Sequence, residues 1–190
     1  MPSENALQGT VVLVTGASSG IGEASARDLA AHGAAVAIAA RRADRLESLA
    51  SEIEEAGGKA LAIECDVTDR ALAQAAVKRT VDELGRLDTV FNNAGVMLLG
   101  PVEGAPVDEW DAMVDLNVKG LLYVADAALP HLLKAAEDEP RQVADLVNIA
   151  PWRGARPTRA AASTTPPSTR SARSASRCAR RSPSATCACR

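Results

Sequence analysis

One stretch decides the fold of this 190-residue chain: Thr15-Gly16-Ala17-Ser18-Ser19-Gly20-Ile21-Gly22. The apolar run at residues 11–14 before it is typical of a buried strand, and helical spacing begins near Gly20. Glycines in such a turn let the backbone approach a pyrophosphate, and the helix N-terminus offers free N–H groups and a positive dipole end. The pattern predicts a dinucleotide-binding turn. The alternative is a glycine-rich strand-to-helix turn that holds no ligand.

Apolar runs and helical periodicities alternate from residue 10 to residue 150. The apolar runs predict strands at residues 10–14, 34–40, 59–65, 87–92 and 143–149, and helices are predicted at 20–31, 44–56, 71–84 and roughly 107–136. Continuously apolar strands suit a parallel sheet that is covered on both faces. The predicted fold is therefore α/β, a Rossmann-type doubly wound parallel sheet with helices on both faces. Its domain covers residues 1–150 and stops after about the fifth strand.

Two arginines follow the second predicted strand. In dinucleotide-binding folds an acid at this place binds the ribose hydroxyls of adenosine, whereas an arginine accommodates a 2′-phosphate. Here Arg41 and Arg42 come first, and no acid appears before Asp44. The sequence therefore favours NADP(H) over NAD(H), with both arginines as cofactor-binding residues. The alternative is a pair of solvated charges at a helix start.

Further motifs accompany the glycine turn. Asn92-Asn93-Ala94-Gly95 follows the fourth predicted strand, and a helical stretch contains Leu116-Asn117-Val118-Lys119-Gly120. Together with the spacing T-G-x-x-x-G-x-G, these motifs resemble the short-chain dehydrogenase/reductase family over residues 7 to about 150. The stretch at residues 92–103 looks like the clavaldehyde dehydrogenase-like branch of that family.

The resemblance implies an oxidoreductase that interconverts an alcohol and a carbonyl by hydride transfer, with a small-molecule substrate and assembly as a homotetramer or homodimer. Asn117 matches the asparagine that helps hold a water on the proton relay, although a buried structural hydrogen bond is the alternative. Asp66 could equally form a turn or a helix cap. The family's cofactor-binding positions correspond here to Thr15, Gly16, Ser18, Ser19, Gly20, Ile21, Gly22, Asp66, Val67, Asn93, Ala94 and Gly95.

Three catalytic residues of the family are missing after the fifth predicted strand. The family has a serine, then a tyrosine, then a lysine four residues later, but Pro151, Thr164 and Ser168 stand at those positions. The tyrosine exchanges a proton with the substrate oxygen, and the lysine lowers the pKa of the tyrosine. We therefore expect the chain as written to be inactive or nearly so.

Residues 151–190 differ in composition from the rest of the chain. They hold nine Arg, no acid and no Val, Ile, Leu, Met or Phe, whereas residues 1–150 hold 12 Lys and Arg and all 24 acids. So little apolar surface cannot offset the entropy of ordering, which predicts a disordered tail. Every residue type in the tail is encoded with G or C at the middle codon position. In a GC-rich gene the third codon position is nearly always G or C, and the loss of one base shifts that third position into the middle. The shifted frame permits serine at 151, tyrosine at 164 and lysine at 168, which predicts a one-base deletion near codon 151.

The remaining features concern location and other functions. No apolar stretch approaches membrane-spanning length and residues 1–5 do not start a secretion signal, so a cytoplasmic protein is predicted. Cys178, Cys187 and Cys189 match no zinc spacing, and no metal site is expected. The alternative function is a non-catalytic NADP-binding module whose basic tail binds RNA or another polyanion. Only Trp152 could stack on bases in that tail, so no nucleic-acid partner is expected.

Overall fold

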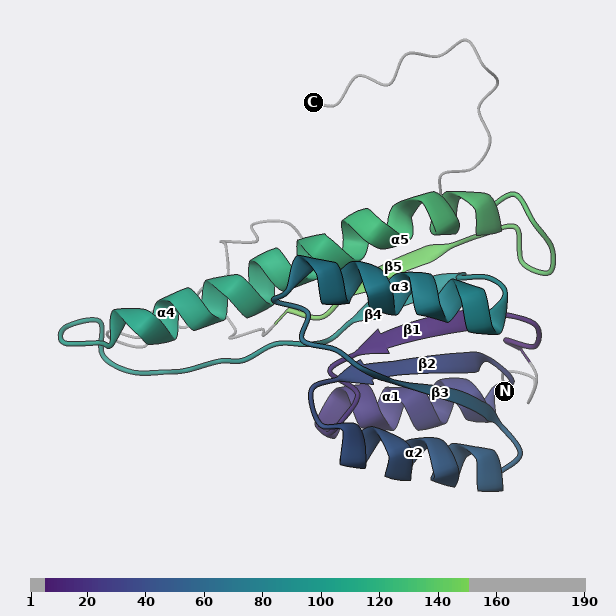
Figure 1. The fold of residues 1–190 in the computed structure, drawn as a ribbon, viewed down its shortest axis with the longest axis horizontal. Helices are drawn as coiled ribbons and strands as arrows, with labels where there is room; N and C mark the ends of the chain where they lie inside the picture. Colours follow the sequence, from purple (N-terminus) through teal and green to yellow (C-terminus); the bar gives the residue numbers. More distant parts are fainter. Residues whose placement is uncertain (1–5, 151–190) are drawn as a thin grey trace, which may run out of the picture.

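The computed structural model describes residues 6–150 and shows one parallel sheet between two layers of helices (Figure 1). The strands are hydrogen-bonded in the order β3-β2-β1-β4-β5, and every pairing is parallel. The chain therefore builds outward from β1 through β2 and β3, then crosses to the other side of β1 for β4 and β5. The predicted doubly wound fold is confirmed. The strands are β1 (Val11–Thr15), β2 (Ala35–Ala40), β3 (Lys59–Glu64), β4 (Thr89–Asn92) and β5 (Asp145–Asn148).

Helices pack on both faces of the sheet. In Figure 1, α1 (Gly20–Ala31) and α2 (Ala43–Glu55) lie on one face, and α3 (Arg70–Leu84) and α5 (Leu121–Ala135) lie on the other. Successive residues of a strand point to opposite faces. In β1, Leu13 is accordingly buried in the core under α3 and α5, and Val12 and Val14 are buried in the core under α1 and α2. No helix within residues 6–150 has the length and apolar character that crossing a membrane requires.

The predicted long helix at residues 107–136 forms, but it is not a regular α-helix throughout. It consists of α4 (Val107–Val114), the π-helical turn η1 (Asp115–Gly120) and α5. Asparagine has poor helix propensity, and π turns inside helices concentrate at functional sites. Asn117 lies inside the π turn. The predicted disordered tail at residues 151–190 lies outside the described residues.

A buried carboxylate joins the amino-terminal ends of three strands. Asp88 is fully buried, and its Oδ2 accepts hydrogen bonds from the Val11 N–H at 2.8 Å and from Arg86 Nε at 2.8 Å. Its Oδ1 accepts from Arg86 Nη2 at 2.6 Å, and its backbone oxygen accepts from the Asp145 N–H at 2.9 Å. A buried charge needs such pairing to be tolerated. Asp88 therefore fastens the sheet at the edge opposite to the one where strand-end loops can bind a ligand.

We predict that Arg86→Ala lowers the free energy of unfolding by about 2–3 kcal/mol, because it leaves the Asp88 carboxylate buried without its counter-ion. The control is Arg79→Ala, which removes an exposed ion pair with Glu83 and should cost less than about 1 kcal/mol. Urea unfolding measured on both variants checks the difference. Equal losses would contradict the structural importance of the buried pair.

Candidate cofactor site

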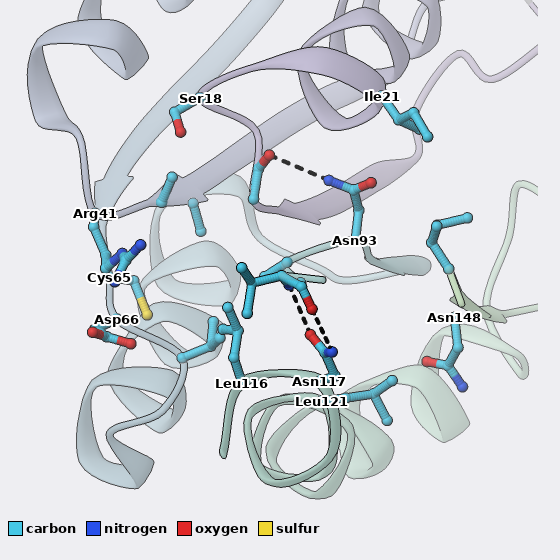
Figure 2. A pocket seen from close by; sticks show the side chains of 18 of the residues that line it. Ser18, Ile21, Arg41, Cys65, Asp66, Asn93, Leu116, Asn117, Leu121 and Asn148 are labelled. Atoms are coloured by element: carbon cyan, nitrogen blue, oxygen red, sulfur yellow. Dashed lines mark hydrogen bonds between the residues drawn. The ribbon is translucent and has the colours of Figure 1, made fainter. Parts of the chain in front are cut away.

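A pocket of about 840 Å³ lies at the carboxyl-terminal edge of the sheet, where the order of strands switches from β1 to β4. Open α/β sheets bind ligands at this switch point. Segments that follow each of the five strands line the pocket, together with η1 and the start of α5 (Figure 2). Every predicted site residue within 6–150 lines it except Thr15, Gly20 and Gly22. The positions of Pro151, Thr164 and Ser168 lie outside the described residues.

Thr15 and Gly22 do not line the pocket, but they allow the glycine turn to contact the loop after β4. Thr15 Oγ1 accepts hydrogen bonds from the N–H groups of Asn93 and Ala94, both at 3.1 Å. Asn93 Nδ2 donates to the backbone oxygens of Thr15 and Gly16, both at 3.2 Å. A Cβ on Gly16 would lie 2.8 Å from the Ala94 Cα, and one on Gly22 would lie 2.5 Å from the Gly16 oxygen. Only glycine fits at these two positions.

The helix that follows the turn is free to receive an anion. Ser19 is the N-cap of α1, and its side chain makes no capping hydrogen bond to the first turn within the described chain. Gly20 has a φ of +61°, and a Cβ there would meet no atom of the described chain within 4 Å. Free N–H groups at a helix start bind phosphate groups well. The residues present therefore fit the pyrophosphate of a dinucleotide.

Arg41 and Arg42 occupy different places at the end of β2. Arg42 Nη2 donates to the hydroxyl oxygens of Ser18 and Ser19, both at 2.9 Å, and to the Ser18 backbone oxygen at 3.1 Å. The Arg41 side chain instead lies beside Asp66 and Cys65 on the pocket wall (Figure 2). One guanidinium therefore braces the glycine turn, and the other faces the pocket.

Asp66 forms a turn after β3, which is one of the roles predicted for it. Its Oδ1 accepts from the Thr68 N–H at 3.0 Å and from Thr68 Oγ1 at 2.8 Å. Burial raises the pKa of Asp66, but the two Thr68 hydrogen bonds and the positive charge of Arg41 outweigh burial, so that the pKa lies below its ordinary value. The carboxylate is therefore ionised at neutral pH. Asp69, not Asp66, caps α3, by accepting from the N–H groups of Ala71 and Leu72.

Cys65 is a buried core thiol, and its sulfur also lies on the pocket wall (Figure 2). Burial raises the pKa of the thiol to about 11, and the nearby carboxylates of Asp66 and Asp69 act in the same direction. The thiol therefore stays protonated at neutral pH.

Asn117 holds the loop after β4 at the opposite end of the pocket. Its Nδ2 donates to the Val96 oxygen at 2.7 Å, and its Oδ1 accepts from the Val96 N–H at 2.8 Å (Figure 2). A Cβ on Gly95 would lie 3.1 Å from Asn117 Oδ1. The side chain of Asn117 therefore makes two partly buried structural hydrogen bonds to one residue of this loop.

Asn148 is a pocket residue that the sequence analysis missed. It ends β5, and its Oδ1 accepts a hydrogen bond from Asn92 Nδ2 at 3.1 Å. Its position at the carboxyl end of a predicted strand was the available signal, because functional residues of such sheets gather at that edge. Leu121 and Leu122 at the start of α5 were also missed, and they add an apolar wall. Within residues 6–150, no three His, Cys, Asp or Glu side chains are grouped to hold a metal.

Comparisons with known proteins identify relatives of this chain. A family model described as short chain dehydrogenase matches residues 10–163. An uncharacterised oxidoreductase of Listeria innocua is 39% identical over 127 residues, which are 67% of this chain and 51% of that protein. This chain thus spans about half the length of such relatives.

Solved structures show the same relationship. A short-chain dehydrogenase/reductase from Serratia marcescens is 45% identical, with a TM-score of 0.64 over 66% of this chain and 52% of that one. A short chain dehydrogenase from Burkholderia cenocepacia, solved in complex with NADP, is 40% identical, with a TM-score of 0.63 over 66% of this chain and 52% of that one.

We predict that the buried Cys65 thiol makes the free energy of unfolding fall as the pH rises into the alkaline range. Unfolding exposes the thiol and returns its pKa to about 8.5, so between about pH 9 and pH 11 the folded state holds a proton that the unfolded state has lost. Raising the pH through this window therefore favours unfolding, by about 1 kcal/mol per pH unit. Urea unfolding under reducing conditions should show the gap in stability between the wild type and Cys65→Ala narrowing from pH 8 to pH 10.5. A constant gap would contradict the raised pKa.

Proposed function

This chain belongs to the short-chain dehydrogenase family, and we propose that its pocket binds NADP(H) for the interconversion of an alcohol and a carbonyl. The observation that carries the proposal is one pocket with an uncapped helix start at its centre, two arginines at one end and two asparagines, Asn117 and Asn148, at the other. The bound nicotinamide would supply or accept the hydride. The chain's own residues hold the cofactor and shape the place where a substrate meets it.

The end of β2 supports NADP(H) over NAD(H). The pocket wall there carries Arg41 and Arg42, and Ser18 offers a hydroxyl beside them. A guanidinium presents several donors to a phosphate, and hydrogen bonds between ionised groups are the strong ones. The 2′-phosphate would lie between Arg41 and the braced pair of Arg42 and Ser18. The NADP complex of the Burkholderia relative is consistent with this assignment.

Asn117 is the proposed proton-relay residue, acting from the π turn. Its side chain is engaged with Val96, which fixes the position of the helix backbone around it. The serine, tyrosine and lysine that would complete the relay are absent, because Pro151, Thr164 and Ser168 stand in their places. The chain as written is therefore proposed to bind cofactor without turnover, and a one-base deletion near codon 151 is the proposed cause.

Assembly into a homodimer or homotetramer is supported by the outer surface of α5. Leu129 and Leu133 are each more than half exposed on it. Exposed leucines at helical spacing favour a protein partner. The stoichiometry and a cytoplasmic location remain predictions.

We predict that Arg41→Ala weakens NADPH binding by about 10- to 100-fold, the value of a lost charge-assisted hydrogen bond or two, and leaves NADH binding nearly unchanged. Arg42→Ala should weaken both cofactors, because Arg42 also braces Ser18 and Ser19. The control is Arg45→Ala, an exposed arginine one turn further along α2 that does not line the pocket. Calorimetric titration with each cofactor measures the effects. An Arg41→Ala chain that loses both cofactors equally would contradict the assignment of Arg41 to the 2′-phosphate.

We predict that the 190-residue chain shows no NADPH oxidation above a no-enzyme blank with a panel of aldehydes and ketones. Sequencing the gene across the codons for residues 148–170 should reveal one base more than the present reading frame contains. The protein translated in the restored frame should then oxidise NADPH with one of these substrates. Turnover by the chain as written would contradict its inactivity. The deletion would be refuted if sequencing confirms the reading frame that encodes residues 151–190 and the shifted frame encodes no Tyr-x-x-x-Lys.

The nine arginines of residues 151–190 favour a second candidate, a non-catalytic NADP-binding module that also binds a polyanion. Counterion release would make such binding weaken steeply as salt increases. Titration of a single-stranded RNA at two salt concentrations separates the candidates. RNA binding that is absent or insensitive to salt would end this one.

A further inference from the structure

In the loop after β4, backbone groups form hydrogen bonds with side chains of the helix formed by α4 and η1. Asn117 binds both the N–H and the carbonyl oxygen of Val96, and the Leu98 N–H donates to Met113 Sδ at 3.3 Å. Met113 and Asn117 are four residues apart, so they lie on the same side of the helix. Backbone groups of residues two apart in an extended chain point the same way. Residues 96–98, which we term the inner wall, are thus fixed at both ends.

Met113 is a buried residue whose sulfur has a polar partner. It is only 1% exposed and is the one buried residue of α4, yet it belongs to neither of the two cores that hold the sheet and its helices together. A thioether is a flexible apolar group with a weak acceptor sulfur. Here that sulfur meets a backbone N–H that a leucine in its place would leave without this acceptor.

The inner wall forms part of the candidate cofactor site. Val96 and Met97 line the pocket, and Met97 lies between the two held residues. Arg41 and Arg42 line the pocket from the end of β2, on the other side of β1 from β4. A dinucleotide whose 2′-phosphate lies at the arginines and whose pyrophosphate lies at the start of α1 would therefore reach the inner wall with its other half.

We propose that Met113 is a positioning residue for the cofactor site, which acts through its sulfur on the Leu98 N–H and so sets the inner wall. The inference rests on the proposed function, since it assigns the inner wall to the nicotinamide half of NADP(H). Met113 touches neither cofactor nor substrate. Its contribution is to keep Val96 and Met97 in one arrangement before the cofactor binds, which lowers the ordering cost of binding.

The test is Met113→Leu in the full chain, a change that nearly conserves volume and removes the acceptor. Its matched control is Leu132→Met, the reverse exchange at a buried residue near the end of α5 that is remote from the inner wall. Two probes are titrated into each chain: NADPH, which spans the pocket, and 2′,5′-ADP, which carries only the half that fits the arginines. Amide hydrogen exchange at Leu98, followed by NMR, reports on the wall directly in each chain and in the wild type.

Met113→Leu should weaken NADPH binding by about three- to tenfold and leave 2′,5′-ADP binding unchanged, as expected for the loss of one hydrogen bond. Leu98 exchange should speed up by a similar factor, and Leu132→Met should change neither quantity. Unchanged NADPH affinity, or equal weakening of both probes, overturns the proposal. If Met113→Leu does not fold, the wild type still decides, because fast Leu98 exchange there refutes the hydrogen bond. If the wild type binds neither probe, the proposed function is overturned, and the positioning role that rests on it is overturned too. In that case Leu98 exchange shows only whether the Met113 sulfur holds the inner wall.

Discussion

The contact between the turn after β1 and the loop after β4 is the constraint on which the whole site depends. Thr15 and Asn93 exchange hydrogen bonds between the two segments, and Gly16 brings their backbones closer than any side chain would allow. Strands β1 and β4 are neighbours in the sheet but 73 residues lie between the end of one and the start of the other. Their loops meet because parallel strands present their carboxyl ends at one edge. This contact therefore holds the glycine turn and the inner wall together.

Electrostatics divides the pocket into two unlike ends. Arg41 and Arg42 both line the pocket after β2, and the ionised Asp66 lies beside Arg41. Arg42 is already held by the Ser18 and Ser19 hydroxyls. Its side chain would therefore lose little conformational entropy when a phosphate binds there. The other end offers the neutral amides of Asn117 and Asn148 and an apolar wall. A ligand with a charged end and a neutral end suits such a pocket.

The sequence predicted the sheet well, because each strand is an apolar run and each turn has its own chemistry. Residues 11–14 are buried on both faces, and helix 20–31 was located to the residue. The π turn could not be predicted, because Asn117 bonds to Val96, which lies 21 residues away. Arg41 and Arg42 were assigned one role, since only the positions of Ser18 and Ser19 reveal that their side chains diverge. Asn148 was missed because its partner, Asn92, is set by the β4–β5 register.

The short π turn spans the distance between two walls of the pocket. Asn117 binds Val96 on one side, and Gly120 packs against Val67 so closely that a Cβ there would lie 2.9 Å from the valine Cγ2. Two residues of η1 that are three positions apart thus connect the loop after β3 with the loop after β4. At this place the two walls cannot separate without distorting η1. A protein that must open to admit its cofactor would have to do so elsewhere along the rim.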